Sequence, residues 1–215
     1  LTVTMNRPER MNALHSPSHF EMDEIFNDFE SDPELWVAIV TGAGDKAFSA
    51  GNDLKWQAEG KKTDPPASGF AGLVNRFNMK KPIIGAVNGL AMGGGFEVAL
   101  ACDIIIAADN AFFALPEPRV GLAALAGGLH RLSRQIPMKQ AMGMILTGRR
   151  VMAEEGYKLG FVTEVVPEGG ALEGARRWAE LISECSPVSI RTSKDVVLRG
   201  QDHPSVGEAM LAEYQ

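Results

Sequence analysis

Two glutamates, Glu97 and Glu117, stand at the edges of strongly apolar stretches of this chain and are its clearest candidates for chemistry. Glu97 follows three glycines and a phenylalanine, and Glu117 lies between two prolines. A carboxylate in apolar surroundings loses hydration, so it must be paired, be neutralised by a raised pKa, or transfer protons. The last role makes this chain a candidate enzyme that uses two carboxyl groups as acid and base.

Two turns rich in small residues accompany the glutamates. Residues 93–95 are three glycines that open a predicted helix, and residues 48–54 follow a predicted strand. Backbone N–H groups at a helix start have no intrahelical acceptor, and the helix dipole adds positive potential there. The glycine turn fits neither of the common nucleotide-binding patterns, and Glu97 would repel a pyrophosphate. We interpret the turns either as places of close packing or as two N–H donors to one oxygen, an oxyanion hole.

The histidines are weaker candidates. His15 and His19 have an i, i+4 spacing that suits a metal, but Pro17 between them places a helix start there, so we interpret both as solvated side chains. His130 has no serine or cysteine motif beside it that it could activate, and no role is assigned to it. No metal site is predicted.

The composition of the 215 residues is that of an ordinary globular protein, with 45% hydrophobic residues and a formal net charge of -6. The acidic balance argues against a general affinity for nucleic acid or for an anionic membrane. Cys102 and Cys185 have no CxxC spacing, which favours a reducing compartment over a disulfide framework. Since no apolar run is long enough to span a bilayer, we expect a cytoplasmic protein, with the mitochondrial matrix as the alternative. Because the chain opens at Leu1 without methionine, we expect that residues precede it.

The distribution of apolar residues predicts an α/β fold. Short β-branched runs are typical of strands buried on both faces, and the apolar spacing between residues 22 and 29 is typical of an amphipathic helix. Prolines and glycines at residues 59–69 predict a loop, either a lid or a plain connection. We expect a sheet-rich core over residues 1–137 and a mostly helical part over residues 138–215. The predicted strands cover residues 1–5, 35–41, 83–87, 103–108, 111–115 and 161–166, and predicted helices begin near residues 16 and 93.

Several short motifs follow one another in a specific order and spacing over nearly the whole chain. They are Asn6-Arg7-Pro8 with Asn12-Ala13-Leu14, Phe48 to Leu54, Lys81-Pro82 to Asn88-Gly89, Gly93 to Glu97, Ala101-Cys102-Asp103, Pro116-Glu117, Gly127-Gly128 and Leu146-Thr147-Gly148. Through them the chain resembles the enoyl-CoA hydratase/isomerase superfamily, the crotonases. The resemblance implies a crotonase-like spiral of ββα units with a C-terminal helical region, assembled as a homotrimer or a dimer of trimers. It also implies an acyl-CoA substrate, no metal, no cofactor beyond the coenzyme A of the substrate, and further helices after Gln215.

The resemblance assigns roles to individual residues. It implies that the backbone N–H groups of Asn52 and Gly94 form the oxyanion hole, and that Glu97 and Glu117 are the two acid/base glutamates of the hydratases. Adding water to a 2-enoyl thioester passes through an enolate-like species, so two fixed donors and two proton-transfer groups suffice. The positions at which the family lines its CoA site are Met11, Ala13, Ala50, Asp53 and Leu54.

Leu125 departs from the most familiar hydratases, which have a glycine within a Pro-Gly-Ala-Gly-Gly stretch where this chain reads Ala-Leu-Ala-Gly-Gly. A branched apolar side chain at this turn is expected to narrow or reshape the acyl pocket. The chain is also similar to the carnitinyl-CoA dehydratase branch over residues 69–73, 96–97, 114–117 and 148–150. That branch has an acid in place of Leu125, and a quaternary ammonium substrate favours an acidic or aromatic partner.

The predicted function is that of a lyase that adds water reversibly to a 2-enoyl-CoA thioester, in a pathway such as fatty acid metabolism. An enoyl-CoA isomerase, for which one glutamate suffices, and a carnitinyl-CoA dehydratase-like lyase are the alternatives among enzymes. An RNA-binding or noncatalytic homologue is the alternative outside enzymes. The acidic charge and the presence of both glutamates with both turns argue against it.

Overall fold

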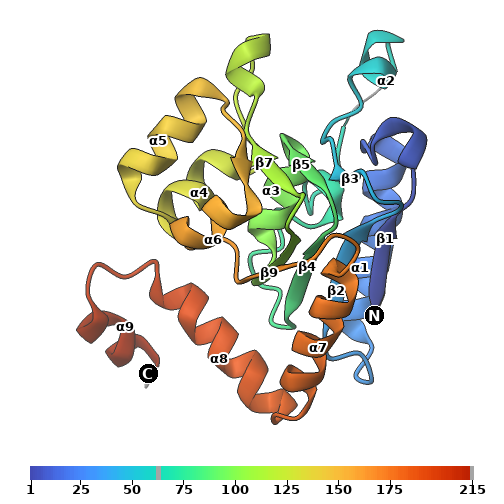
Figure 1. Cartoon of the computed structure of the whole chain (residues 1–215). Helices are drawn as coiled ribbons and strands as arrows, with labels where there is room; N and C mark the ends of the chain where they lie inside the picture. The colour runs from blue at the N-terminus through green and yellow to red at the C-terminus, as the bar shows by residue number, and fades with distance from the viewer. Residues whose placement is uncertain (62–63, 214–215) are drawn as a thin grey trace.

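The computed structural model describes residues 1–61 and 64–213. Its strands form two sheets that are covered by helices, and further helices make up most of the C-terminal part (Figure 1). The strands are β1 (Thr2–Met5), β2 (Ala38–Gly42), β3 (Ala47–Ser49), β4 (Ile83–Val87), β5 (Leu90–Met92), β6 (Ile104–Ala108), β7 (Phe112–Ala114), β8 (Val151–Met152) and β9 (Glu164–Val166). The α-helices are α1 (Ser16–Ser31), α2 (Leu54–Ala58), α3 (Gly94–Ala101), α4 (Gly128–Gln135), α5 (Met138–Thr147), α6 (Ala153–Leu159), α7 (Ala171–Ser183), α8 (Pro187–Gly200) and α9 (Val206–Glu213). The short 3-10 helices are η1 (Pro8–Arg10), η2 (Phe70–Gly72) and η3 (Glu117–Val120).

The larger sheet is five-stranded and parallel throughout, in the order β1-β2-β4-β6-β9. Its central strands are the predicted β-branched runs, because every residue of β2 and β4 is buried and such strands must be apolar on both faces. Helix α7 packs across β2, β4 and β6. A methyl group added to Gly174 of α7 would lie 2.8 Å from Ile106 Cγ2, so this glycine lets the helix approach the sheet closely.

The smaller sheet has the order β3-β5-β7-β8 and is parallel except for its last pair. Three successive units each place one strand in the larger sheet and the next in the smaller sheet before a helical segment: β2-β3-α2, β4-β5-α3 and β6-β7-η3. The α/β fold built from ββα units is thereby confirmed. The separate strands β3, β5 and β8 were not predicted from periodicity, because runs of two or three residues cannot be told from turns.

Two strands start three residues later in the structure than predicted, for local reasons. β2 starts at Ala38, because the Leu35 N–H closes a turn onto the Asp32 carbonyl at 3.2 Å. β9 starts late because the N–H groups of residues 161 and 162 donate to the Gly156 carbonyl, each at 3.2 Å, and so complete the end of α6. In both cases a neighbouring turn takes the hydrogen-bonding groups that a longer strand would need.

The predictions for longer stretches have mixed outcomes. The described residues of the predicted loop at 59–69 contain no helix or strand, and residues 62–63 lie outside the described part. The predicted boundary after residue 137 falls between α4 and α5 and stays a prediction. Most of the chain beyond it is helical, but β8 and β9 return to the two sheets. Helices α8 and α9 extend away from the sheets in Figure 1. None of the described helices is long and apolar enough to cross a membrane.

Candidate active site

The segments predicted for the site follow the carboxyl ends of three neighbouring strands of the smaller sheet. β3 leads into Asn52, and β7 leads into Glu117. Between them, β5 leads into Gly94 and the first turn of α3, which contains Glu97. Because the carboxyl ends of adjacent parallel strands meet at one edge of a sheet, the order β3-β5-β7 gathers these segments there.

Glu97 is buried within the first turn of α3, with only 4% of the residue exposed. The chain enters this turn through Gly93, whose φ of 53° lies in the left-handed region that favours glycine. Oε1 of Glu97 accepts a hydrogen bond from the Gly128 N–H at 2.9 Å. Burial is the main reason why the pKa of Glu97 is raised to about 7; the Gly128 hydrogen bond opposes this shift, and the charge of Glu117 adds to it.

Glu117 opens η3 and is half-buried against the start of α3. A methyl group added to Gly93 would lie 2.9 Å from Glu117 Oε1. The other oxygen, Oε2, is buried and has no hydrogen-bond partner among the described residues. Burial raises the pKa of this carboxyl group as well, against the effect of a hydrogen bond from its own backbone N–H. A buried carboxyl oxygen without a hydrogen-bond partner is available to exchange a proton with a molecule bound in the site.

The two carboxyl groups act on each other electrostatically, since the charge of Glu117 contributes to the raised pKa of Glu97. Burial raises the pKa of both carboxyl groups, so each keeps its proton to a higher pH than an exposed glutamate does. Such a pair can deliver a proton to one atom of a bound molecule and accept a proton at another.

The backbone around Asn52 lies against the N-terminal end of α3. Gly94 is the first residue of that helix, so its N–H has no intrahelical acceptor. On the other side, Leu14 bonds to the carbonyl of Gly51 at 2.7 Å and to the N–H of Asp53 at 2.8 Å. Because successive residues of an extended segment direct their amides to opposite sides, the Asn52 N–H points away from Leu14. A methyl group added to Gly51 would lie 2.7 Å from the Gly94 nitrogen, which places the segment beside the free N–H end of α3.

Two residues at the site were not assigned a role from the sequence. Gly128 belongs to a recognised pair of glycines, but nothing in the spacing indicated that its N–H donates to Glu97. Phe70 lies in η2 and reaches α3: a methyl group added to Gly94 would lie 2.6 Å from both Cε1 and Cζ of its ring. These are tertiary contacts, and no local pattern of residues encodes them.

The family model described as Enoyl-CoA hydratase/isomerase matches residues 1–213, with both glutamates and both turns inside the match. The chain belongs to the enoyl-CoA hydratase/isomerase family. It is 45% identical over 206 residues to the carnitinyl-CoA dehydratase of Escherichia coli (strain K12), covering 95% of this chain and 78% of that relative. It is similar to the crystal structure of a carnitinyl-CoA hydratase from Mycobacterium avium, with a TM-score of 0.88, 42% identity, and coverage of 91% of this chain and 76% of that one. It is also similar to the enoyl-CoA hydratase of Mycobacterium tuberculosis H37Rv, with a TM-score of 0.93, 35% identity, and coverage of 99% and 83%.

The positions expected to line the CoA site of this family fall on two backbone segments that hydrogen-bond to each other. The Ala50 N–H donates to the Met11 carbonyl at 2.9 Å. Asp53 accepts hydrogen bonds from the first N–H groups of α2 as its N-cap and pairs with Arg7 at 2.9 Å, so its carboxylate is occupied by structural partners. The five positions differ in exposure, with Ala13 and Asp53 buried, Ala50 half-buried, and Met11 and Leu54 exposed.

Leu125 lies in the turn before α4 and is 78% exposed, whereas the adjacent Ala124 is buried. The turn lies close to Glu97, because α4 begins at Gly128, whose N–H donates to Glu97. That Leu125 narrows the acyl pocket stays a prediction, since its side chain is not packed into the interior of the described chain.

One interpretation of the histidines is wrong. His19 is not solvated: it is 1% exposed, and its Nδ1 accepts a hydrogen bond from the Ala71 N–H at 3.0 Å. Burial lowers the pKa of His19 to about 4, so the ring is neutral. His15 does precede the helix as expected, at its N-cap, and His130 is exposed. Within residues 1–61 and 64–213, no group of three His, Cys, Asp or Glu side chains could hold a metal ion.

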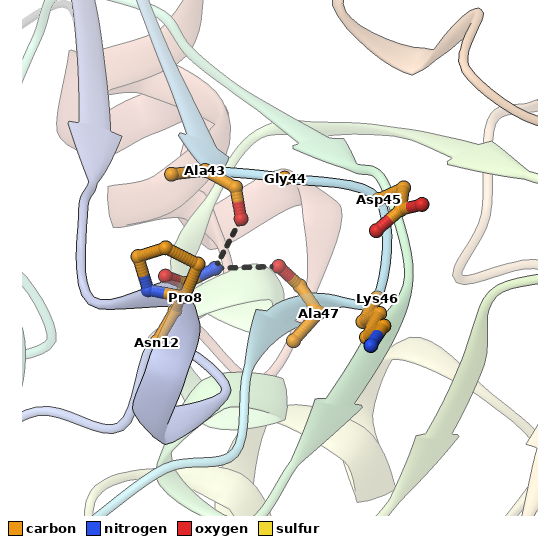
Figure 2. A pocket seen from close by; sticks show the side chains of 7 residues that line it. All are labelled: Pro8, Asn12, Ala43, Gly44, Asp45, Lys46 and Ala47. Carbon is orange, nitrogen blue, oxygen red and sulfur yellow. Dashed lines mark hydrogen bonds between the residues drawn. The ribbon is translucent and has the colours of Figure 1, made fainter.

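A separate hollow of about 200 Å³ lies at the turn between β2 and β3 (Figure 2). The Asn12 side chain spans this turn, donating through Nδ2 to the carbonyls of Ala43 and Ala47 at 3.0 and 2.7 Å. None of the residues predicted for the reaction or for CoA lines the hollow, so it is not part of the candidate active site.

Proposed function

We propose that the protein is a lyase that adds water reversibly across the double bond of a 2-enoyl-CoA thioester. The observation that carries this proposal is the meeting of two carboxyl groups of raised pKa, Glu97 and Glu117, beside the free N–H end of α3. Membership of the family and similarity to proteins named as hydratases and dehydratases support the same chemistry. Burying an ionisable carboxyl group such as Glu97 is costly, and strongly perturbed pKa values cluster at functional sites, which supports a catalytic role over a noncatalytic one.

The positions of these groups support the following reaction. The thioester oxygen accepts hydrogen bonds from the N–H groups of Asn52 and Gly94, and each such donor is worth about 3 kcal/mol when the oxygen becomes negatively charged. Ionised Glu97 takes a proton from water as the water oxygen bonds to Cβ, and the π electrons move onto the thioester to form the enolate. Glu117 then gives its proton to Cα, and a proton returning from Glu97 to Glu117 resets the pair. Dehydration runs through the same steps in reverse.

A panel of thioesters tests the reaction. The protein is incubated with 2-enoyl-CoA and 3-enoyl-CoA thioesters, and the conjugated absorbance is followed with identification of the product. Loss of absorbance from 2-enoyl-CoA with formation of 3-hydroxyacyl-CoA is the expected result. Conversion of 3-enoyl-CoA to 2-enoyl-CoA without addition of water would replace the proposal by an isomerase, for which one glutamate suffices. Salt-dependent binding of RNA without turnover would replace it by a binding protein.

A second candidate substrate is a carnitinyl-CoA thioester, favoured by the 45% identity to carnitinyl-CoA dehydratases. Leu125 argues for an uncharged acyl group instead, because an aliphatic side chain offers a quaternary ammonium neither negative charge nor an aromatic face. Comparing kcat/KM for crotonobetainyl-CoA and crotonyl-CoA on the same preparation decides between them. A ratio above one for crotonobetainyl-CoA would make the carnitinyl thioester the substrate.

We also propose that the protein assembles as a homotrimer or a dimer of trimers and acts in the cytoplasm, with no nucleic-acid or membrane partner. An apolar row on α5, formed by Met138, Met142 and Leu146, is exposed at i, i+4 and i+8 and would be covered by another copy. Light scattering during gel filtration should give the mass of three or six chains. A monomeric mass would refute the assembly, and fractionation of the native cells tests the compartment.

A further inference from the structure

The ring of Phe70 packs against the first residue of α3. A methyl group added to Gly94 would lie 2.6 Å from Cε1 and Cζ of this ring, so the edge of the ring contacts the Gly94 α-carbon. The ring therefore fills the space that a side chain at Gly94 would occupy, next to an N–H group proposed to bind the thioester oxygen. Excluding water strengthens a hydrogen bond to a developing negative charge. The position of the Phe70 ring thus bears directly on the chemistry.

The segment that carries Phe70 is short and strained. η2 contains three residues, and its central residue, Ala71, has a φ of 56°. A residue with a Cβ in the left-handed region costs of order 1 kcal/mol and persists only where its surroundings hold it. The surroundings that hold Ala71 and Phe70 are therefore part of the positioning of the ring.

His19 is the side chain that contacts both of these residues. Its Nδ1 accepts the Ala71 N–H at 3.0 Å, and the centroid of its ring lies 4.4 Å from that of Phe70. Since His19 is 1% exposed, no bulk water can replace the hydrogen bond to Ala71. The lone pair on Nδ1 is present because burial keeps the pKa of His19 at about 4 and the ring neutral.

Other contacts attach the residues after Phe70 to α1 but do not reach its ring. A methyl group added to Gly72 would lie 2.5 Å from the Asp23 α-carbon, so the two backbones touch. Arg76 donates to the Gly72 carbonyl at 2.7 Å and to Asp23 Oδ1 at 2.6 Å. These contacts anchor the end of η2, whereas His19 contacts the Phe70 ring itself, which also packs against the hydrophobic core.

We propose that His19 is a positioning residue for the reaction, acting through Ala71 and Phe70 to keep the aromatic ring seated on Gly94. The inference rests on the proposed role of the Gly94 N–H as a donor to the thioester oxygen. It assigns no contact with the substrate to His19 itself. Loss of the support should let the ring turn and water reach the donor, so it should lower kcat more than it changes KM.

Single variants test the support. His19→Leu removes the acceptor for the Ala71 N–H and should lower kcat about 10- to 100-fold, since displacements of about 1 Å in a catalytic site have effects of this size. KM should change by less than about threefold, because the CoA-lining segments are untouched. His19→Asn, whose Oδ1 can take the place of Nδ1, should restore kcat to within about threefold of the parent. His130→Leu, the same exchange at an exposed histidine, is the matched control and should leave both constants unchanged.

A double-mutant cycle with Phe70→Ala separates positioning from general stability. If His19 acts through the ring, adding His19→Leu to Phe70→Ala should cost less than about threefold further in kcat. An equal loss in both backgrounds, or a loss that only follows the unfolded fraction, would overturn the proposal. If His19→Leu does not fold, His19→Gln, whose amide oxygen reaches past the Nδ1 position, takes its place in the cycle. A parental protein without turnover would refute the proposed function, whereas full activity of folded His19→Leu would refute the positioning role alone.

Discussion

Replacing Glu97 by glutamine should stabilise the protein while it removes most of the activity. Burial raises the pKa of Glu97 to about 7, which means that ionising this carboxyl group is costly in the folded chain. Glutamine has nearly the same shape, and its amide oxygen can still accept the Gly128 N–H that Glu97 accepts at 2.9 Å. It carries no charge, so the folded state no longer bears the cost of burying one.

The increase in stability expected from Glu97→Gln depends on pH. Between the ordinary value of 4.5 and the folded value of about 7, the folded chain keeps a proton on Glu97 that the unfolded chain releases. The parental protein therefore loses stability as the pH rises through this window, and the loss is complete above it. By linkage, the raised pKa of Glu97 lowers the free energy of unfolding of the parent by about 3 kcal/mol at pH 8 and by about 1 kcal/mol at pH 5. Because Glu97→Gln removes this cost, it should raise the free energy of unfolding by about the same amount at each pH.

Urea unfolding of the parent and of Glu97→Gln at pH 8 and pH 5, at one protein concentration, measures both values. At pH 8 the melting temperature should rise by about 6–12 °C. Glu21→Gln removes an exposed carboxylate from α1 and should change stability by less than about 0.5 kcal/mol at either pH. The kcat for hydration should fall by a factor of about 10² to 10⁴. An increase in stability that does not depend on pH, or no increase at pH 8, would refute the claim that ionising Glu97 is costly in the folded chain. A near-parental kcat would refute the role of Glu97 as the base.

Three further substitutions test other parts of the site. Glu117→Gln should lower kcat by a factor of about 10² to 10⁴ with little change in KM, and continued exchange of solvent hydrogen at Cα would contradict its role as the acid. Gly51→Ala places a methyl group 2.7 Å from the Gly94 nitrogen at a φ of 86°, so it should lower kcat/KM by about 100-fold or more in a steady-state assay. Leu125→Ala should change the kcat/KM ratio of long to short enoyl thioesters by about tenfold, whereas Leu122→Ala, at another exposed leucine, should not. An unchanged ratio for Leu125→Ala would remove this residue from the acyl pocket.

The larger sheet could be predicted from the sequence because its strands carry their own signal. Each of β2, β4 and β6 is five residues long and lies within an apolar, β-branched run. A strand buried on both faces needs such a run, so composition and structure coincide there. β3 and β5 have three residues each, too few for a period of two to appear, whereas β7 lies within the apolar run predicted as a strand at residues 111–115. The smaller sheet holds the site together, and two of the three strands that lead into the site, β3 and β5, were not apparent from the pattern of residues.

The candidate site likewise contains residues that could be predicted from the sequence and residues that could not. Glu97 and Glu117 could be singled out because a carboxyl group in an apolar stretch is chemically unusual wherever it occurs. His19 could not, because its partner Ala71 is 52 residues further along the chain and a histidine at an apparent helix start is ordinarily exposed. The sequence correctly placed the start of α1 beside His15, but which face of that helix η2 would cover depends on tertiary packing.

The register of the short strands decides which backbone N–H reaches the site. β3 pairs with β5 through Ala47 and Ser49, and the register shifts between these two residues, as at a bulge. Since amides alternate in direction along an extended segment, a shift by one residue would turn the Asn52 N–H toward Leu14 and away from α3. The Asn52 side chain is engaged elsewhere, donating to Gln57 Oε1 at 3.2 Å. The proposed donor therefore depends on the direction of the backbone at the Leu14–Asn52 bridge, and the identity of the side chain at position 52 is secondary.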